Sequence, residues 1–491
     1  MLRYGVLVMV QAMVAAASLV VEIVAGRMLA PYVGMSLYTW TSIIAVVLAG
    51  FSVGHWIGGR IAEKEPQSAL TWNGWSMIAA AVTVAGAVFI LRVVAGPVLE
   101  TVVNPVASII LLTVFVFFLP SLFAGIPAPI LAMIAVRRYP DHQGRVLGAL
   151  FAAGAWGAIL GTLAAGFVFI SWLGTIGTLV VVCVVYCALA AHSFLAAGRA
   201  GALASSVVPA LIAAFAIGTP NPCTVESQYF CIRVIDEGSE RLMVLDHLVH
   251  GIAVRDDPLA MANPHGLMLD SLPRLRMQGQ DRWSAFFIGG GSYSVPRAWA
   301  QNPAISVTVA EIDPLVTETA RQSFWYEPGT HRIVHEDARR VLASEAMLYD
   351  VIVGDAFGDI AVPQHLITRE FFELVNQRLE PGGIYVMNVI DQMGSWRVLG
   401  SMVQTARQVW PSVEVWADPA HDPAADRRVF VIVAGDAPSA ASQVRQTGPY
   451  AARAVRVSAE SVDTIVQQGR AMIFTDDFAP IDRLLSDTGE S

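Results

Sequence analysis

Residues 284–294 read SAFFIGGGSYS, an apolar run that ends in three successive glycines. The run predicts a buried strand, and the glycines allow a sharp turn and close approach to a ligand before a helix begins. The next apolar run, ISVTVAEIDP at residues 305–314, predicts a second strand ending near Glu311. An acid about 20 residues after such glycines accepts hydrogen bonds from ribose hydroxyls in nucleotide-binding folds. Together the two runs predict a nucleoside site at Gly289, Gly290 and Gly291.

Two later segments extend this pattern. Residues 349–355, YDVIVGD, predict a strand with Asp355 at its carboxyl end, where open α/β sheets bind ligands. Residues 335–340, HEDARR, predict a turn into a helix. Asp337 in that turn either accepts from an adenine amino group or caps the helix that begins at Ala338. The alternation of strands and helices predicts a doubly wound α/β domain.

Composition changes sharply upstream of this domain. The chain has 491 residues, of which 55% are hydrophobic and 14% charged, against about 25% charged in an ordinary soluble domain. Residues 1–218 carry five acids and nine bases, whereas residues 219–491 carry 35 acids and 22 bases. The acidic second half argues against nucleic acid as a partner and suits a cationic substrate.

The first half contains stretches long enough to cross a bilayer, each with about 20 mostly apolar residues. Seven such stretches are predicted, at about 5–25, 40–60, 72–95, 107–135, 147–170, 173–197 and 202–218. The fourth holds Pro120, Pro127 and Pro129, which predict a kink or a break. Gly157 and Gly161 lie four residues apart and favour close helix packing.

Glu22 lies inside the first apolar stretch. A carboxylate within the membrane is costly and faces the bundle interior by default, which makes Glu22 a candidate substrate or proton site. The alternative is a structural role, either as an ion pair with Arg27 or as a helix-end group near the interface.

Basic residues between the stretches predict the orientation. Arg27 and Arg92 fall on one side of a seven-span arrangement, and the other seven fall on the opposite side, namely Arg3, Arg60, Lys64, Arg137, Arg138, Arg145 and Arg199. This predicts a cell (inner) membrane protein whose N-terminus lies in the cytoplasm and whose second half lies outside the cytoplasm. Cys223 and Cys231 would then lie where a disulfide persists. If residues 107–135 cross twice, the second half is cytoplasmic instead.

The predicted organisation is therefore a transmembrane helical domain at 1–218, a linker with a small β-sheet at 219–280, and an α/β domain at 281–491. Alternating residues around 229–234 and 241–246 predict the small sheet. His247 and His250 lack further ligands at suitable spacing, so no metal site is expected.

The motifs in this order resemble those of spermidine synthases, which are polyamine aminopropyltransferases with a class I methyltransferase-like fold. The resemblance covers about 230–435, and its motifs are GGG at 289–291, EIDP at 311–314, DA at 337–338, Asp355, HLITREFF at 365–372 and PGG at 381–383. The first half, with EIVAGR at 22–27 and APY at 30–32, resembles the multi-pass segment of fused membrane spermidine-synthase-like proteins.

The resemblance implies a role for each motif. The glycines and Glu311 would hold the ribose region of decarboxylated S-adenosylmethionine or S-adenosylmethionine, and Asp337 with Ala338 its adenine. Asp355 would orient and deprotonate an attacking amine such as putrescine. The family resemblance also implies a homodimer.

Three positions depart from the family pattern. Ser292 stands where the family has an acid, His250 where it has a glutamine, and Gly358 where it has a second acid, with Asp359 one residue later. His250, Ser292 and Asp359 are the candidate amine contacts, and His265 falls in the family's substrate-lid region. Two alternatives stay open: a methyltransferase acting on a membrane-associated substrate, and a non-catalytic polyamine sensor or transporter that also uses Glu22.

Overall fold

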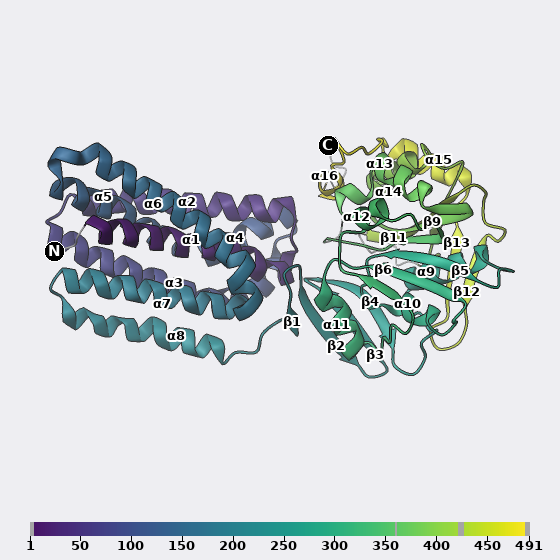
Figure 1. Cartoon of the computed structure of the whole chain (residues 1–491), viewed down its shortest axis with the longest axis horizontal. Helices are drawn as coiled ribbons and strands as arrows, with labels where there is room; N and C mark the ends of the chain where they lie inside the picture. Colours follow the sequence, from purple (N-terminus) through teal and green to yellow (C-terminus); the bar gives the residue numbers. More distant parts are fainter. Residues whose placement is uncertain (1–3, 359–360, 421–426, 487–491) are drawn as a thin grey trace. The chain divides into compact units, whose positions relative to one another are not determined.

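The computed structural model describes residues 4–358, 361–420 and 427–486. The chain forms two compact units, Met1–Cys231 and Ile232–Ser491 (Figure 1). The boundary lies beyond the predicted end of the membrane domain at residue 218. Residues 219–231 group with the helices because side chains of the bundle hold this linker, as described below.

The first unit is a helical bundle. Its α-helices are α1 (Tyr4–Val33), α2 (Leu37–Ala62), α3 (Pro66–Thr101), α4 (Pro105–Gly125), α5 (Pro127–Arg138), α6 (Gln143–Ala164), α7 (Ile170–Ala196) and α8 (Val207–Ile217). Within the described residues, six helical segments are long and apolar enough to cross a membrane. The predicted break in the fourth stretch is confirmed, because α4 ends at Gly125 and Pro127 begins α5.

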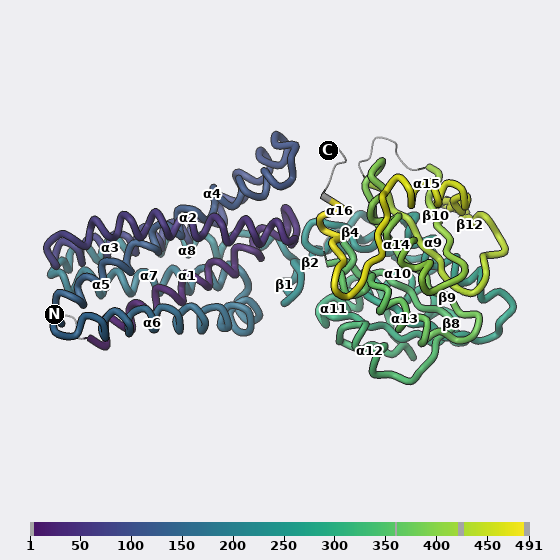
Figure 2. The backbone as a smooth tube through the Cα atoms, turned by 90° about the horizontal axis from the view of Figure 1, so that it is seen from above, coloured from purple at the N-terminus to yellow at the C-terminus, as the bar shows by residue number. Residues whose placement is uncertain are grey.

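One of the six segments, Pro140–Ala196, contains two of the seven predicted stretches. Its 57 residues correspond to about 85 Å of helix, whereas a bilayer core is about 30 Å thick. Gly174 has a left-handed φ of 66° and interrupts the segment near its middle. The helices α6 and α7 accordingly run along the bundle separately in both views (Figures 1 and 2). Seven crossings remain a prediction.

The outer face of α6 and the start of α7 is apolar. Phe151, Trp156, Phe167 and Trp172 are 74%, 64%, 72% and 83% exposed. A water-soluble helix would bury rings of this size, so their exposure in a row is typical of a lipid-facing surface.

Glycines bring the backbones of the bundle together. The close packing predicted for Gly157 and Gly161 is observed, since a Cβ at either position would overlap the carbonyl oxygen of Ala12 or Ala16 in α1. A second glycine row, which the sequence analysis did not single out, joins α2 to α4. A Cβ at Gly50, Gly54 or Gly58 would overlap atoms of the α4 backbone or of Ile126 just beyond it.

Bundle side chains hold the linker by polar contacts. Arg27 donates to the carbonyl oxygens of Ser227 and Tyr229 at 2.8 and 2.7 Å, and Arg92 donates to Pro220 at 2.6 Å. Glu226 accepts from the backbone and hydroxyl of Thr175 in α7 at 2.6 and 2.7 Å. A disulfide joins Cys223 to Cys231, as predicted.

Glu22 is partly buried in α1. The structure shows no ion pair between Glu22 and Arg27 in the residues it describes, so that alternative is wrong. The Arg27 guanidinium donates to the two linker carbonyls instead. A functional role for Glu22 stays a prediction.

The second unit contains a nine-stranded sheet in the order β12-β13-β10-β11-β9-β8-β5-β6-β7. Its strands are β5 (Trp283–Ile288), β6 (Ile305–Ala310), β7 (Arg332–Val334), β8 (Tyr349–Gly354), β9 (Leu379–Gln392), β10 (Ser412–Ala417), β11 (Arg427–Gly435), β12 (Gln443–Gln446) and β13 (Ala452–Arg456). β5 through β9 pair with one another in parallel, and β11 pairs antiparallel with both β9 and β10. This is the α/β sheet of a methyltransferase-like fold, as predicted.

Helices cover the sheet on both faces. They are α9 (Pro264–Arg276), α10 (Ser294–Trp299), α11 (Pro314–Ser323), α12 (Ala338–Ser344), α13 (Arg369–Gln377), α14 (Arg397–Ala406), α15 (Ala459–Gln468) and α16 (Ile481–Ser486). Buried side chains of α12, α13 and α14, such as Leu342, Phe371 and Met402, form one apolar cluster with Phe286 and Ile352 of the sheet. The parallel strands are buried on both faces and read as apolar runs for this reason.

The small sheet predicted upstream is also present. β2 (Cys231–Glu237), β3 (Glu240–Leu245) and β4 (Leu248–Val254) form an antiparallel meander, and β1 (Val225–Glu226) lies in the linker. Arg297 of α10 donates to the carbonyl oxygens of Val254 and Arg255, which ties β4 to the large domain.

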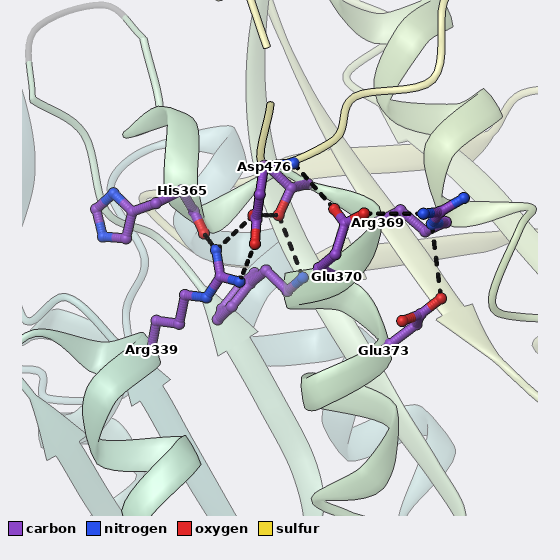
Figure 3. A network of polar contacts seen from close by, with 8 residues as sticks. Arg339, His365, Arg369, Glu370, Glu373 and Asp476 are labelled. Atoms are coloured by element: carbon purple, nitrogen blue, oxygen red, sulfur yellow. Dashed lines mark hydrogen bonds and ion pairs between the residues drawn. The ribbon is translucent and has the colours of Figure 1, made fainter. Parts of the chain in front are cut away.

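A polar network holds the C-terminal segment against α12 and α13 (Figure 3). Arg339 donates to both carboxylate oxygens of Asp476 at 2.7 and 2.6 Å and to the carbonyl of His365. Thr368 donates to the same aspartate, and the backbone N–H of Asp476 donates to Glu370. The paired geometry between a guanidinium and a carboxylate is the strong form of such contacts.

We expect Arg339→Gln to loosen this segment. Both partners are partly exposed, so the loss is about 1 kcal/mol, which corresponds to about fivefold faster protease cleavage between residues 470 and 486. Arg340→Gln is the control, because this neighbouring guanidinium pairs with Glu336, four residues earlier, and not with the C-terminal segment as far as the structure describes it. Equal cleavage rates for the two variants would contradict the assigned role of Arg339.

Candidate functional site

The glycine turn follows β5 directly. Gly289 and Gly291 have left-handed φ angles of 89° and 51°, which favour glycine. A Cβ at Gly289 would lie 2.6 Å from the carbonyl oxygen of Asp355, and one at Gly291 would lie 3.0 Å from that of His250. Glycine is therefore required at both positions, because the turn packs directly against the backbones of Asp355 and His250.

Glu311 follows β6 and faces the glycine turn. Its carboxylate accepts from the backbone N–H groups of Gly290 and Asp313 at 2.8 and 2.9 Å. Burial raises the pKa of Glu311 to about 7, against the opposing effect of these backbone donors. Each carboxylate oxygen accepts more than one hydrogen bond, so Glu311 keeps acceptor capacity for a ligand hydroxyl.

Asp337 caps α12, which is one of its two predicted roles. Its Oδ1 accepts from the backbone N–H of Arg340 at 3.0 Å, and its Oδ2 lies 2.7 Å from Nε2 of His365. Both oxygens thus have protein partners, and an adenine amino group would have to share Oδ2 with His365. The adenine role of Asp337 and Ala338 stays a prediction.

Asp355 follows β8, beside the glycine turn. Asn388 of β9 donates to its Oδ1 at 2.9 Å and fixes the carboxylate. Asn388 is 4% exposed and was not predicted as a site residue. The available signal was its position, a polar residue inside the apolar run YVMNVI at 385–390.

Two histidines lie near this carboxylate. His250 and His265 line one pocket with Asp355, and Nδ1 of His250 contacts the carbonyl of Leu248 at 3.0 Å. Burial lowers the pKa of both imidazoles, and the Asp355 charge opposes this effect. Burial therefore favours the neutral form of both rings.

Ser292 lines the same pocket and is 3% exposed. Its hydroxyl forms a hydrogen bond with that of Ser294 at 2.7 Å, and Ser294 donates to the carbonyl of Ile252. The third predicted amine contact, Asp359, lies outside the described residues.

The structure thus brings most predicted site residues to one edge of the sheet. The glycine turn, Glu311 and Asp355 follow β5, β6 and β8, and β5 lies between the other two strands. After β5 the chain forms β6 on one side of it and later forms β8 on the other side. This change of direction is the topological switch point, where α/β sheets bind ligands. The arrangement offers a nucleoside cradle beside one fixed carboxylate.

Part of this chain is similar in sequence to known proteins. Residues 279–419 match the spermine/spermidine synthase domain. A polyamine aminopropyltransferase from Vibrio vulnificus is 39% identical over 106 residues, which are 21% of this chain and 36% of that protein. Putrescine N-methyltransferase 4 of Nicotiana tabacum is 28% identical over 130 residues, 25% of this chain and 34% of that protein. This chain thus spans about a third of the length of these relatives.

Solved structures were compared as well. A probable spermidine synthase from Corynebacterium glutamicum aligns with 53% of this chain and 99% of its own, with 23% identity and a TM-score of 0.46. On the domain match and the sequence relatives, the C-terminal region of this chain is a spermidine synthase domain with a methyltransferase-like fold.

Proposed function

We propose that this chain is a membrane-anchored aminopropyltransferase that uses decarboxylated S-adenosylmethionine and an amine acceptor such as putrescine. The observation that carries the proposal is the contact of the glycine turn with the Asp355 backbone, within the region that matches the spermine/spermidine synthase domain. A nucleoside donor held by Gly289–Gly291 and Glu311 would present its reactive carbon near that carboxylate.

The chemistry needs few groups. The lone pair of a neutral amine attacks the carbon next to the sulfonium, a C–N bond forms, and the C–S bond breaks with its electron pair going to sulfur. The new ammonium then releases a proton, which Asp355 accepts. The sulfonium supplies the leaving group, so the protein mainly aligns the two reactants. Asn388 occupies Oδ1 of Asp355, which directs Oδ2 to the amine.

We propose that the helical bundle anchors the α/β domain in a cell (inner) membrane, with the α/β domain outside the cytoplasm. Two observations support this orientation. Arg27 and Arg92, the two basic residues predicted on the outer side, both bind the linker. Arg137 of α5, predicted on the cytoplasmic side, instead contacts the carbonyl of Lys64, which is predicted on that side too. The Cys223–Cys231 disulfide favours an oxidising compartment for the linker. An activity fusion at Ser491 that reports only from the cytoplasm would contradict this orientation by giving signal.

A second candidate is methyl transfer from S-adenosylmethionine to an amine. The similarity to tobacco putrescine N-methyltransferase 4, at 28% identity over 130 residues, favours it. The two reactions differ in the donor group and its by-product, so the donor decides between them. The resemblance also leads us to propose a homodimer, and the acidic second half leads us to propose that nucleic acid is not a partner.

The test uses the purified full chain in detergent with each donor and a panel of amines. Aminopropyl transfer releases methylthioadenosine from the decarboxylated donor, and methyl transfer releases S-adenosylhomocysteine from S-adenosylmethionine. Methylthioadenosine release that requires an amine supports the proposal. Release of S-adenosylhomocysteine alone supports the second candidate, and binding without release of either by-product supports a sensor or transporter.

Glu311 gives a pH prediction for donor binding. A ribose hydroxyl donates best to the ionised carboxylate, and the pKa of Glu311 is raised to about 7. Methylthioadenosine should therefore bind about tenfold more tightly at about pH 8 than at about pH 6, since ionised Glu311 increases by that factor. Calorimetric titration at both pH values measures this.

Glu311→Gln keeps the size of the side chain and removes its titration. We expect weaker binding of methylthioadenosine, by about 10-fold or more, with no pH dependence over the same range. An unchanged pH profile in this variant would exclude Glu311 as the titrating group.

A further inference from the structure

A second pocket lies within the helical unit, where the bundle holds the linker. It has a volume of about 390 Å³ including its open mouth, within the range of small-ligand pockets. Its walls come from the end of α1, the second half of α3, the start of α7 and the linker. The residues that line it are all in the first unit, whereas those of the nucleoside site are all in the second.

Two arginines of this pocket are held in place by uncharged groups. Arg27 and Arg92 both line it, and their hydrogen bonds go to backbone carbonyl oxygens of the linker. A carbonyl oxygen has no formal charge, so these contacts position the guanidiniums without neutralising them. Nε of Arg27 is buried and has no hydrogen-bond partner among the described residues. A buried donor without an acceptor is costly, and an acceptor bound beside Arg27 would satisfy it.

The carboxylate of Glu226 also lines the pocket, but the linker and α7 already occupy its oxygens. Oε2 accepts from the backbone N–H and the hydroxyl of Thr175 at 2.6 and 2.7 Å, and Oε1 accepts from the side-chain amide of Asn221 at 2.7 Å. The described lining residues thus carry two positive charges and one negative charge. This excess of positive charge favours a ligand with a single negative charge.

Much of the remaining wall is hydrocarbon. Met28 of α1, Leu91 of α3 and Ile176 of α7 line the pocket. Contact with an alkyl chain would remove this apolar surface from water, whereas a hydrated inorganic ion would not. Trp172, four residues before Ile176, is 83% exposed and belongs to the lipid-facing surface described above. The start of α7 therefore contributes both to the lipid-facing surface and to the pocket.

We propose that this pocket binds a membrane amphiphile with a singly charged oxyanion head, such as the phosphodiester of an anionic lipid. The oxyanion accepts from Arg27 and Arg92, and the alkyl chain lies along the apolar wall. A guanidinium forms strong, charge-assisted hydrogen bonds with phosphate or carboxylate oxygens. Because the same arginines hold the linker, a bound head group would fasten the linker to the bundle. The pocket lies outside the α/β unit, so it can be tested separately from the transfer reaction.

Native mass spectrometry of the purified full chain in detergent measures lipid binding. Phosphatidylglycerol and phosphatidylcholine with the same acyl chains differ in net charge. One phosphatidylglycerol per chain should bind at least about tenfold more tightly than phosphatidylcholine. Equal binding of the two lipids would overturn the inference.

Two further ligands separate the head from the chain. Oleate has a carboxylate on an alkyl chain, and glycerophosphoglycerol is the head group of phosphatidylglycerol without its acyl chains. Tighter binding of oleate than of phosphatidylglycerol would support the pocket and identify a carboxylate as its preferred head. Binding of glycerophosphoglycerol as tight as that of phosphatidylglycerol would contradict the role of the apolar wall and overturn the inference.

A matched pair of arginine variants locates the binding. Arg92→Gln removes one guanidinium from the pocket and should weaken phosphatidylglycerol binding by about tenfold. Arg137→Gln is the control, because Arg137 also donates to backbone carbonyl oxygens, those of Glu63 and Lys64, but does not line the pocket. This control should bind phosphatidylglycerol as the wild type does. Equal affinities of the two variants would overturn the inference.

A second pair of variants leaves both guanidiniums in place and keeps the inference testable if Arg92→Gln does not fold. Ile176→Trp fills the pocket from a partly exposed position, and Val184→Trp adds the same ring at a position of α7 that is 61% exposed. Ile176→Trp should weaken phosphatidylglycerol binding by a similar factor, and Val184→Trp should leave it unchanged. Wild-type affinity in Ile176→Trp would show that the lipid binds elsewhere.

Discussion

Asp355→Asn is expected to lower amine-dependent by-product release by about 10²–10⁴-fold, the usual contribution of a positioned acid–base group. The change keeps the shape of the side chain. Its amide oxygen still accepts from Asn388, which donates to Oδ1 at 2.9 Å in the native chain. What is lost is the negative charge that attracts the ammonium and accepts the proton. Steady-state release of the donor's nucleoside by-product measures the effect.

Two controls separate chemistry from folding. Asp350→Asn changes a carboxylate at the opposite end of the same strand, where it accepts from the backbone and hydroxyl of Ser284. That variant should retain most of the activity if it folds. Binding of methylthioadenosine should be nearly unchanged in Asp355→Asn, because Glu311 and the glycine turn are intact. Wild-type release by Asp355→Asn would remove this residue from the mechanism.

The core of the site was predictable because its residues follow directly from strand ends. Gly289, Glu311 and Asp355 each come after an apolar run, and parallel strands present their carboxyl ends at one edge. This local rule requires no knowledge of which helices pack where. The small sheet before the α/β domain was predicted from a different pattern, the alternating residues around 229–234 and 241–246.

Residues that depend on distant partners were not predictable in this way. Asn388 meets Asp355 across 33 residues of chain, and its own run reads as an ordinary buried strand. Asp337 had two plausible roles, and the His365 contact that occupies its second oxygen comes from a turn 28 residues later. Sequence periodicity reports which face is buried but not which polar groups meet there.

The contacts of the linker were also not predictable, because their partners are even further apart in the sequence. Arg27 binds the carbonyls of Ser227 and Tyr229, about 200 residues further on. Glu22 is only five residues away in the chain, so local reasoning considered that pair. Carbonyl groups are present in every residue, and no sequence pattern marks the ones that an arginine will bind.

Gly54→Leu is expected to prevent the bundle from folding, because α2 and α4 touch backbone to backbone at this position. Even a Cβ at Gly54 would overlap the carbonyl oxygen of Leu122 and lie 3.0 Å from Cα of Gly125. Atoms of a helix backbone cannot move aside as a flexible side chain can, so the two helices must separate. Membrane helices associate mainly through such close packing, which makes the loss exceed the about 1–3 kcal/mol of ordinary overpacking. Gly59→Leu is the matched control, five residues along α2, where an added Cβ meets no atom within 4 Å. Monodisperse recovery in detergent and the temperature of unfolding measure the difference, with little folded Gly54→Leu and near-normal Gly59→Leu expected. Equal recovery of both variants would mean that α2 and α4 do not rely on this contact.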